Sequence, residues 1–310
     1  MTAIPYSNMS KFKIYSKDVP QGEDFNGTLK EAKVEAEKIK RQHKGDYKTW
    51  IGRDGLRVVL LSGPSCVGKG PLVASIDKFF PNISYSTVPV IKAKESRPKG
   101  PRPEELDLWD NPNYFRSANE IKNLSKDPLR YLVGECRGLP NAIDLDRILG
   151  AKHNLVLVEV YHTVGSQINS LKNILPGADK LNVFVSPVSQ KEITAWKLQN
   201  VGLDQKIKKI MLNKLNARSK YQGANPEDPS VIKDNLKRAE DAYHELQSAH
   251  KYTHVLVNPY GEGHPHWNRT PNGEFTKKPQ GGALKIVKSF ADILKKGKSK
   301  YVEHWDSDTI

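Results

Sequence analysis

Cysteine is scarce in this sequence, with Cys66 and Cys136 the two present among 310 residues. Two cysteines exclude the disulfide framework of a small secreted domain and favour a reducing cytoplasm. Long apolar runs are also missing, so the sequence offers no segment able to cross a bilayer. Residues 1–18 lack the apolar stretch of a secretory signal. We therefore expect a cytoplasmic protein with no membrane partner.

Acidic residues are outnumbered, with 35 Asp and Glu against 49 Lys and Arg and a net charge of +14 at pH 7. This excess favours polyanionic partners, either nucleotides or nucleic acid, although solvated lysines alone produce the same balance in many basic proteins. The length suffices for one large domain or two small ones. The oligomeric state is left open.

Short apolar runs rich in β-branched residues predict buried strands. Runs of this continuous kind are typical of a parallel sheet that is covered by helices on both faces. Helix formers and apolar residues at helical spacing predict helices between the strands. We expect an α/β fold with a mainly parallel central sheet. The predicted strands are 56–62, 154–160, 181–186 and 253–258; the predicted helices are 28–43, about 190–217, about 230–250 and 283–296; residues 1–27, 92–113 and 259–282 are predicted to be irregular.

A glycine-rich loop lies between the first predicted strand of the core and a helix that begins near Lys69. The stretch VVLLSGPSCVGKGPLV carries a Gly-x-x-x-x-Gly-Lys frame. Such a loop points backbone N–H groups at phosphate oxygens, the helix N-terminus adds partial positive charge, and the lysine reaches the β- and γ-phosphates. The sequence therefore predicts an ATP site formed by Gly63, Pro64, Ser65, Cys66, Val67, Gly68, Lys69 and Gly70.

Two positions of this loop are unusual. Gly70 and Pro71 stand where the motif carries a serine or threonine that ligates Mg²⁺. Magnesium can still be held by ATP oxygens and water, because it keeps much of its hydration shell. Cys66 occupies a position where the loop usually has glycine. Its thiol lies near a helix N-terminus and a lysine, so either its pKa is lowered or the side chain is simply accommodated in the packing.

The loop resembles that of the guanylate kinase family, which reads L-S-G-P-S-G-x-G-K-[SG]-[ST]-L, and the resemblance continues in the family's order across residues 55–295. It implies a P-loop NTPase-type three-layer fold with an acceptor-binding insert and a lid, and ATP- and Mg²⁺-dependent phosphoryl transfer. The segments that carry it are KGPRPEE (99–105), NYFRSANEI (113–121), VLVEVYHTVGSQI (156–168), LNVFVSPVSQKEI (181–193), KLNAR (214–218) and THVLVN (253–258).

The resemblance also implies a division of the chain. We expect an N-terminal arm with one helix, a kinase domain and a C-terminal tail. Within the kinase domain we expect an acceptor-binding insert, a lid and a long loop insertion. The corresponding ranges are 1–52 for the arm, 53–296 for the domain, about 83–152 for the insert, about 198–230 for the lid, 259–282 for the loop insertion and 297–310 for the tail.

Matching positions imply roles for particular side chains. Lys99 and Arg102 stand where the family grips the acceptor phosphate, and Tyr114 falls in a second acceptor-binding segment. Lys214 and Arg218 stand at lid positions, four residues apart and so on one helix face. Three further residues complete the set: Glu159, which would orient Mg²⁺ through water, and the pair Asn235 and Arg238, which lies where the family has another helix arginine.

The base-reading residues depart from the family. Aligned on Gly138, the position of the guanine-reading glutamate falls on Leu132, while Asn141 and Ile143 replace a tyrosine and a serine. Leucine cannot accept hydrogen bonds from guanine. Glu135 would substitute if the backbone shifts. The sequence therefore does not identify the acceptor, which is GMP, another nucleotide, a sugar phosphate, or a nucleic-acid end or modified base. A guanylate-kinase-like binding module without catalysis is the alternative class of protein.

Histidines near the C-terminal end offer a further pattern. Glu262, His264 and His266 suggest a metal site, but two histidines in a loop without a third ligand at useful spacing more often serve as polar loop residues.

Overall fold

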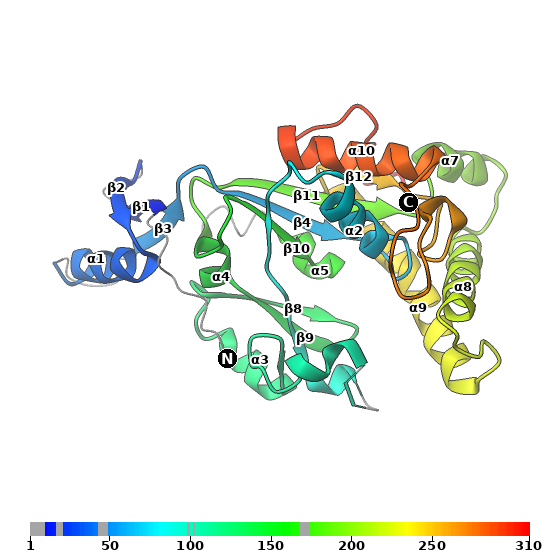
Figure 1. The fold of residues 1–310 in the computed structure, drawn as a ribbon, viewed down its shortest axis with the longest axis horizontal. Helices are drawn as coiled ribbons and strands as arrows, with labels where there is room; N and C mark the ends of the chain where they lie inside the picture. Colours follow the sequence, from blue (N-terminus) through cyan, green and yellow to red (C-terminus); the bar gives the residue numbers. More distant parts are fainter. Residues whose placement is uncertain (1–9, 17–20, 43–48, 98–99, 102, 168–173) are drawn as a thin grey trace. The chain divides into compact units, whose positions relative to one another are not determined.

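The computed structural model describes residues 10–16, 21–42, 49–97, 100–101, 103–167 and 174–310 (Figure 1). By their internal contacts, residues 1–60 and 85–181 form one compact unit, unit 1, and residues 61–84 and 182–310 form another, unit 2. The division into arm, kinase domain and tail that the sequence suggests stays a prediction.

The central sheet has five strands in the order β12-β11-β4-β10-β5. Strand β11 runs parallel to β12, with Val183 opposite His254, and β10 runs parallel to β5. The four strands predicted from apolar runs are therefore confirmed, and so is the mainly parallel α/β fold. The strands span Arg57–Ser62 (β4), Ser86–Thr87 (β5), Leu155–Glu159 (β10), Asp179–Ser186 (β11) and His254–Val257 (β12).

Helices lie on both sides of the strands of unit 2 (Figure 1). Phe184 of β11 and Val255 of β12 are register partners, and both belong to a buried cluster with side chains of α7, α8 and α9. Helix α10 instead contacts β12 and α2. The helices span Lys69–Phe79 (α2), Gln190–Leu198 (α7), Leu203–Tyr221 (α8), Pro229–Gln247 (α9) and Gly281–Lys296 (α10), with short 3₁₀ turns at Ala249–Lys251 (η3) and Pro265–Trp267 (η4).

One predicted helix is wrong in its extent. The pattern at about 190–217 forms two helices, α7 and α8, rather than one. Asn200, between them, has φ +52°, in the left-handed region that ends a helix, and Gly202 is the N-cap of α8. Apolar side chains recur at helical spacing on both sides of this break, which hides the break from a periodicity count.

Unit 1 has its own four-stranded sheet, in the order β7-β6-β9-β8. Strands β8 and β9 form a hairpin closed by Arg137 (φ +54°) and Gly138 (φ +80°), the backbone of a tight two-residue turn. The elements here are β6 (Ile91–Ala93), β7 (Phe115–Arg116), β8 (Tyr131–Cys136), β9 (Leu139–Asp144), α3 (Ala118–Leu124), α4 (Leu145–Leu149) and α5 (His162–Gly165).

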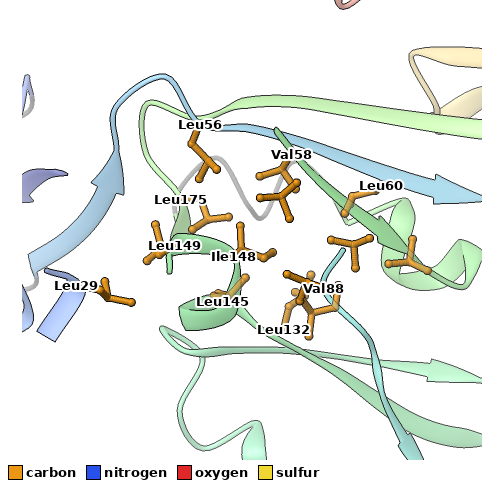
Figure 2. Close-up of a cluster of buried hydrophobic side chains, with 14 of the residues drawn as sticks. Leu29, Leu56, Val58, Leu60, Val88, Leu132, Leu145, Ile148, Leu149 and Leu175 are labelled. Carbon is orange, nitrogen blue, oxygen red and sulfur yellow. The ribbon is translucent and has the colours of Figure 1, made fainter. Parts of the chain in front are cut away.

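The main core of unit 1 joins these elements to β4 and β10. Figure 2 shows Val58 and Leu60 of β4 in one cluster with Ile148 of α4 and with Leu132 of β8. All four side chains are at most 7% exposed. At about 1.5–3 kcal/mol for each fully buried large aliphatic side chain, this cluster is a main source of the unit's stability.

The N-terminal residues that the structure describes are not irregular as predicted. Strands β1 (Ser10–Ser16), β2 (Glu23–Gly27) and β3 (Thr49–Arg53) form an antiparallel sheet in the order β2-β1-β3. Phe12 and Ile14 are buried while Lys11 is exposed, which is the period-two alternation of a strand with one covered face. The predicted helix is confirmed as α1 (Leu29–Gln42).

The segment 92–113 is mainly loop, as predicted, with the end of β6 and two short 3₁₀ turns, η1 (Lys94–Ser96) and η2 (Pro103–Leu108). Among the described residues, no helix combines the length and the apolar character that a membrane span requires.

Candidate functional site

Residues 63–70, which we call the phosphate loop after their predicted role, connect β4 to α2. The loop contains two glycines that no other residue replaces without strain. Gly63 has φ +136°, and a Cβ there would lie 2.3 Å from the carbonyl oxygen of Val185. Gly68 has φ +94°, and a Cβ there would lie 2.4 Å from Nδ2 of Asn258. Backbone therefore packs directly against β11 and against the end of β12, so the strands fix the course of the loop.

Asn258 anchors the loop and was not singled out by the sequence. Its side chain is fully buried at the end of β12. Its Nδ2 donates to the carbonyl of Val67 at 2.6 Å, and its Oδ1 accepts from the backbone N–H of Tyr260 at 3.1 Å. The one signal available in the sequence is an amide side chain directly after a buried strand.

Lys69 lies over the loop that precedes it. Its ammonium donates to the carbonyls of Gly63 at 2.7 Å and of Pro64 at 3.1 Å. The first turn of α2 has no acidic residue, and Gly68, its N-cap, supplies no capping side chain. A helix N-terminus with a lysine and no carboxylate suits a polyphosphate, so these residues fit the triphosphate that the loop predicts.

Cys66 is accommodated by packing rather than activated. Its φ is +67°, in the left-handed region where the loop usually has glycine. The side chain is 2% exposed, and its Sγ–H donates to the carbonyl of Lys214 at 3.2 Å. Burial raises the pKa of the Cys66 thiol, so the alternative of a lowered pKa is wrong. The effect of burial outweighs the attraction of the nearby cations Lys214 and Arg218.

The two cations at the predicted lid positions, Lys214 and Arg218, both contact the segment that follows β12. The Lys214 ammonium donates to the carbonyl of Pro259. The Arg218 guanidinium lies 3.6 Å from the Glu262 carboxylate, and its Nε is buried without a hydrogen-bond partner among the described residues. Burial lowers the pKa of Lys214 to about 8. Lys214, Arg218 and Lys69 thus all belong to unit 2.

Asn235 and Arg238 have structural contacts of their own. Asn235 is 2% exposed on α9, and its Nδ2 donates to Asn216 Oδ1 at 3.0 Å and to Ser219 Oγ at 3.2 Å, both on α8. Arg238 pairs with Asp234, four residues earlier, at 2.8 Å. Asn235 therefore joins α9 to α8 in the position where the family resemblance places an arginine.

The segment 259–282 packs on itself and on α8. The rings of Tyr260, His264 and His266 lie 4.6–4.9 Å apart by their centroids. Trp267 is fully buried, and its Nε1 donates to the carbonyl of Gly261 at 3.0 Å. No group of three potential metal ligands occurs in the part of the chain that the structure describes. Glu262 is directed to Arg218 instead.

The predicted acceptor side belongs to unit 1, and part of it lies outside the described residues. Lys99 and Arg102 are in that part, so their role stays a prediction. Tyr114 is half-buried, with the Arg147 guanidinium 5.3 Å from its ring centroid. Arg97, which the sequence did not single out, forms a bidentate pair with Glu105 through two contacts of 2.7 Å. The one sign of Arg97 in the sequence was its place in the same basic segment as Lys99 and Arg102.

The predicted base-reading positions on β8 and β9 differ in their exposure to solvent. Leu132 is 7% exposed and Ile143 is 1% exposed, and both belong to the core cluster. Figure 2 shows Leu132 beside Val88 in that cluster. Glu135, three residues further along β8, is exposed, and its backbone carbonyl accepts a hydrogen bond from the Thr163 hydroxyl. Glu135 can therefore present a carboxylate to a ligand, while position 132 cannot.

Glu159 ends β10 as the single exposed residue of that strand, after three buried residues, Val156, Leu157 and Val158. The carboxyl ends of parallel strands are where ligands bind in open α/β sheets. Its position is compatible with the predicted contact to Mg²⁺ through water, which stays a prediction.

Similarity to known proteins points in one direction, although no protein family model matches the chain. Guanylate kinase from Synechococcus sp. is 27% identical over 187 residues, which are 59% of this chain and 78% of that protein. Guanylate kinase from Mycoplasma mobile is 32% identical over 202 residues, covering 59% of this chain and 92% of that protein.

A crystal structure of guanylate kinase from Anaplasma phagocytophilum is 13% identical and matches 79% of this chain and 87% of that one, with a TM-score of 0.38. The sequence match to the Mycoplasma protein is the stronger finding, since it spans nearly the whole of that protein. With its phosphate loop between β4 and α2, this chain belongs to the guanylate kinase family.

Proposed function

We propose that this protein transfers a phosphoryl group from ATP to the phosphate of a nucleotide-like acceptor. The observation that carries the proposal is the loop of Lys69. The ammonium of this lysine is held over the loop by the carbonyls of Gly63 and Pro64, beside a helix N-terminus free of acidic residues in its first turn. This arrangement neutralises a polyphosphate and leaves the backbone N–H groups to orient it.

The lid cations supply the charge that phosphoryl transfer requires. Catalysis of this kind rests on positioning and on neutralising charge that spreads over the transferred oxygens. Lys214 binds the carbonyl oxygen of Pro259, and Arg218 pairs with the carboxylate of Glu262. On binding, phosphate oxygens would replace these partners, since a doubly charged group outcompetes a carbonyl or a single carboxylate.

Magnesium bound with ATP would supply positive charge that neutralises the phosphate oxygens. The residues present offer it no direct hydroxyl ligand at Gly70 or Pro71. Glu159 would hold it through water, and the nucleotide's own oxygens would supply the other ligands.

For the acceptor we propose GMP, read by Glu135. The support is geometric: Glu135 is exposed on β8, whereas Leu132 is packed in the core. A carboxylate accepts hydrogen bonds from the two neighbouring donors on guanine, which adenine and the pyrimidines do not present together. Guanylate kinase is also the name of the relatives that match the chain. Lys99 and Arg102 would grip the acceptor phosphate.

The experiment is a coupled assay of ATP turnover with GMP, AMP, CMP, UMP, sugar phosphates and oligonucleotides, together with calorimetry of ATP binding. Lys69→Ala should abolish turnover and weaken ATP binding without unfolding the protein. Lys78→Ala is the matched control, because it removes the same charge from an exposed position of the same helix. Turnover on GMP above all other acceptors is the expected result.

Two outcomes would overturn parts of the proposal. ATP turnover with a different acceptor would keep the kinase and refute GMP. If the wild-type protein binds no ATP, the proposal of a kinase is refuted and a binding module without catalysis is favoured. The absence of a serine or threonine at positions 70 and 71 of the loop would agree with that class.

A further inference from the structure

The solvent-exposed face of α10 is rich in lysine. The exposed residues of this helix are Gly281 and four lysines, and the helix has one acidic residue, Asp292, which pairs with Lys296 at 2.9 Å. Residues 281–301 contain six lysines and one aspartate, a net charge of +5 within a protein of +14. The lysines of this face are Lys285, Lys288, Lys295 and Lys296, and Lys298 and Lys300 follow the end of the helix.

The opposite face of α10 is already used. Ile286, Val287, Phe290, Ile293 and Leu294 are all buried in unit 2. The helix therefore has no apolar side left to insert into a bilayer, and stable membrane attachment requires such burial in addition to charge. The exposed side of the helix presents a row of ammonium groups, which would bind by charge.

An exposed aromatic ring joins the helix to the residues that follow it. Tyr301 is 44% exposed, with the ammonium of Lys285 4.3 Å and that of Lys300 4.8 Å from its ring centroid. The ring thus gathers one cation from the helix and one from the C-terminal segment. Two like charges on a single ring favour an anion as their common partner, and exposed aromatics beside cations are what single-stranded nucleic acid uses for stacking.

We propose that this face, the lysine face of α10 with Tyr301, binds the phosphate backbone of a nucleic acid. From Lys285 to Lys296 the helix axis extends roughly 16 Å, since each residue adds about 1.5 Å. In a duplex each strand has one phosphate per about 3.4 Å of helix axis, so the face matches the axial length of about five of them. Lysines act as point charges here, so the binding is independent of sequence.

The test is fluorescence anisotropy of a labelled single-stranded DNA oligonucleotide, and of its duplex, with the full chain at several salt concentrations. We plot the logarithm of the association constant against the logarithm of the salt concentration. For about five phosphate contacts on a single strand, the slope of this plot should be near −3.5. The variant Lys285→Gln, Lys288→Gln, Lys295→Gln and Lys296→Gln should bind at least about tenfold more weakly, with a slope reduced by about three.

The matched control removes the same four charges elsewhere. Lys30→Gln, Lys38→Gln, Lys40→Gln and Arg41→Gln lie at exposed positions of α1 and should change the affinity by less than about threefold. All eight positions are exposed, so both proteins should keep the wild-type melting temperature.

Three results would overturn the proposal. An equal loss in both variants would mean that total charge, not this face, governs binding. Displacement of the oligonucleotide by stoichiometric ATP would place it in the phosphate loop. Binding to phosphatidylserine vesicles through these lysines, with no binding to either oligonucleotide, would make the partner a lipid surface.

Discussion

Replacing Asn258 with alanine tests whether the end of β12 fixes the phosphate loop. The substitution removes the donor to the Val67 carbonyl, at 2.6 Å, and the acceptor for the Tyr260 N–H, at 3.1 Å. Val67 is fully buried, so its carbonyl would be left without a partner, whereas Tyr260 is half-buried and its N–H can reach water.

The expected cost follows from that difference. A buried polar group that loses its partner costs about 1–3 kcal/mol, and a partly hydrated one costs less. Together they give a loss of about 2–3 kcal/mol in the free energy of unfolding. Because the released carbonyl belongs to the loop itself, ATP affinity should also fall about tenfold, equivalent to about 1.4 kcal/mol.

Asn182→Ala is the control, since Asn182 has the same two kinds of bond at a distance from the loop in sequence. This fully buried residue of β11 donates to the Lys251 carbonyl at 2.9 Å and accepts from the Thr253 N–H at 2.6 Å. Its replacement should lower the urea midpoint comparably and leave ATP affinity unchanged. Urea denaturation followed by circular dichroism gives the first quantity, and calorimetry gives the second.

The reasoning fails if Asn258→Ala loses stability but binds ATP as the wild type does. In that case the loop holds its shape without the anchor. It also fails if both variants weaken ATP binding equally, because general destabilisation would then explain the effect.

Three more predictions concern the metal, the lid and the base. Apart from its chain neighbours and the backbone of its own helix, no described atom lies within 4 Å of a side-chain carbon placed at Gly70, so Gly70→Ser should fold normally and lower the Mg²⁺ concentration for half-maximal turnover; an unchanged requirement would mean that another ligand fills that position. Burial holds the pKa of Lys214 near 8, below its ordinary 10.5, so kcat/KM for ATP should fall as pH rises through about 8, while stability rises from there towards 10.5 because the unfolded chain still binds that proton. Lys214→Arg should flatten the kinetic profile, and a profile that keeps the same falling limb would remove Lys214 from the site. Glu135→Gln should raise KM for GMP at least about tenfold while leaving that for AMP unchanged, and equal changes for both would show that Glu135 does not read the base.

Much of the central sheet could be predicted from the sequence because its strands are buried on both faces. A continuous apolar run such as that of β4 has few alternatives in a polar chain. The small sheet of β1, β2 and β3 was missed for the opposite reason. Its first strand has one covered face, so Phe12 and Ile14 alternate with lysines and resemble a charged loop.

The phosphate loop was predictable because its chemistry is local, with the glycines and the lysine adjacent in the chain. At Cys66 the sequence left two alternatives, a lowered pKa or accommodation in the packing, and the burial of the thiol, which raises its pKa, decides for the second. Asn258 was missed because its importance depends on a contact with Val67, 191 positions away in the chain. The grip of Lys99 and Arg102 on a phosphate stays a prediction.

The amide of Asn235 between α8 and α9 has a mechanical consequence. It satisfies its donors only when it faces Asn216 and Ser219, so sliding one helix by a turn along the other would strand a buried amide against apolar side chains. A polar residue in this situation fixes the register of a helix pair. Helices α8 and α9 form a hairpin whose register is therefore fixed, and Lys214 and Arg218 both lie on α8. If α8 and α9 move, we expect them to move as one pair about their ends, such as residues 199–202 before α8, and to carry the backbone of Lys214 and Arg218 together.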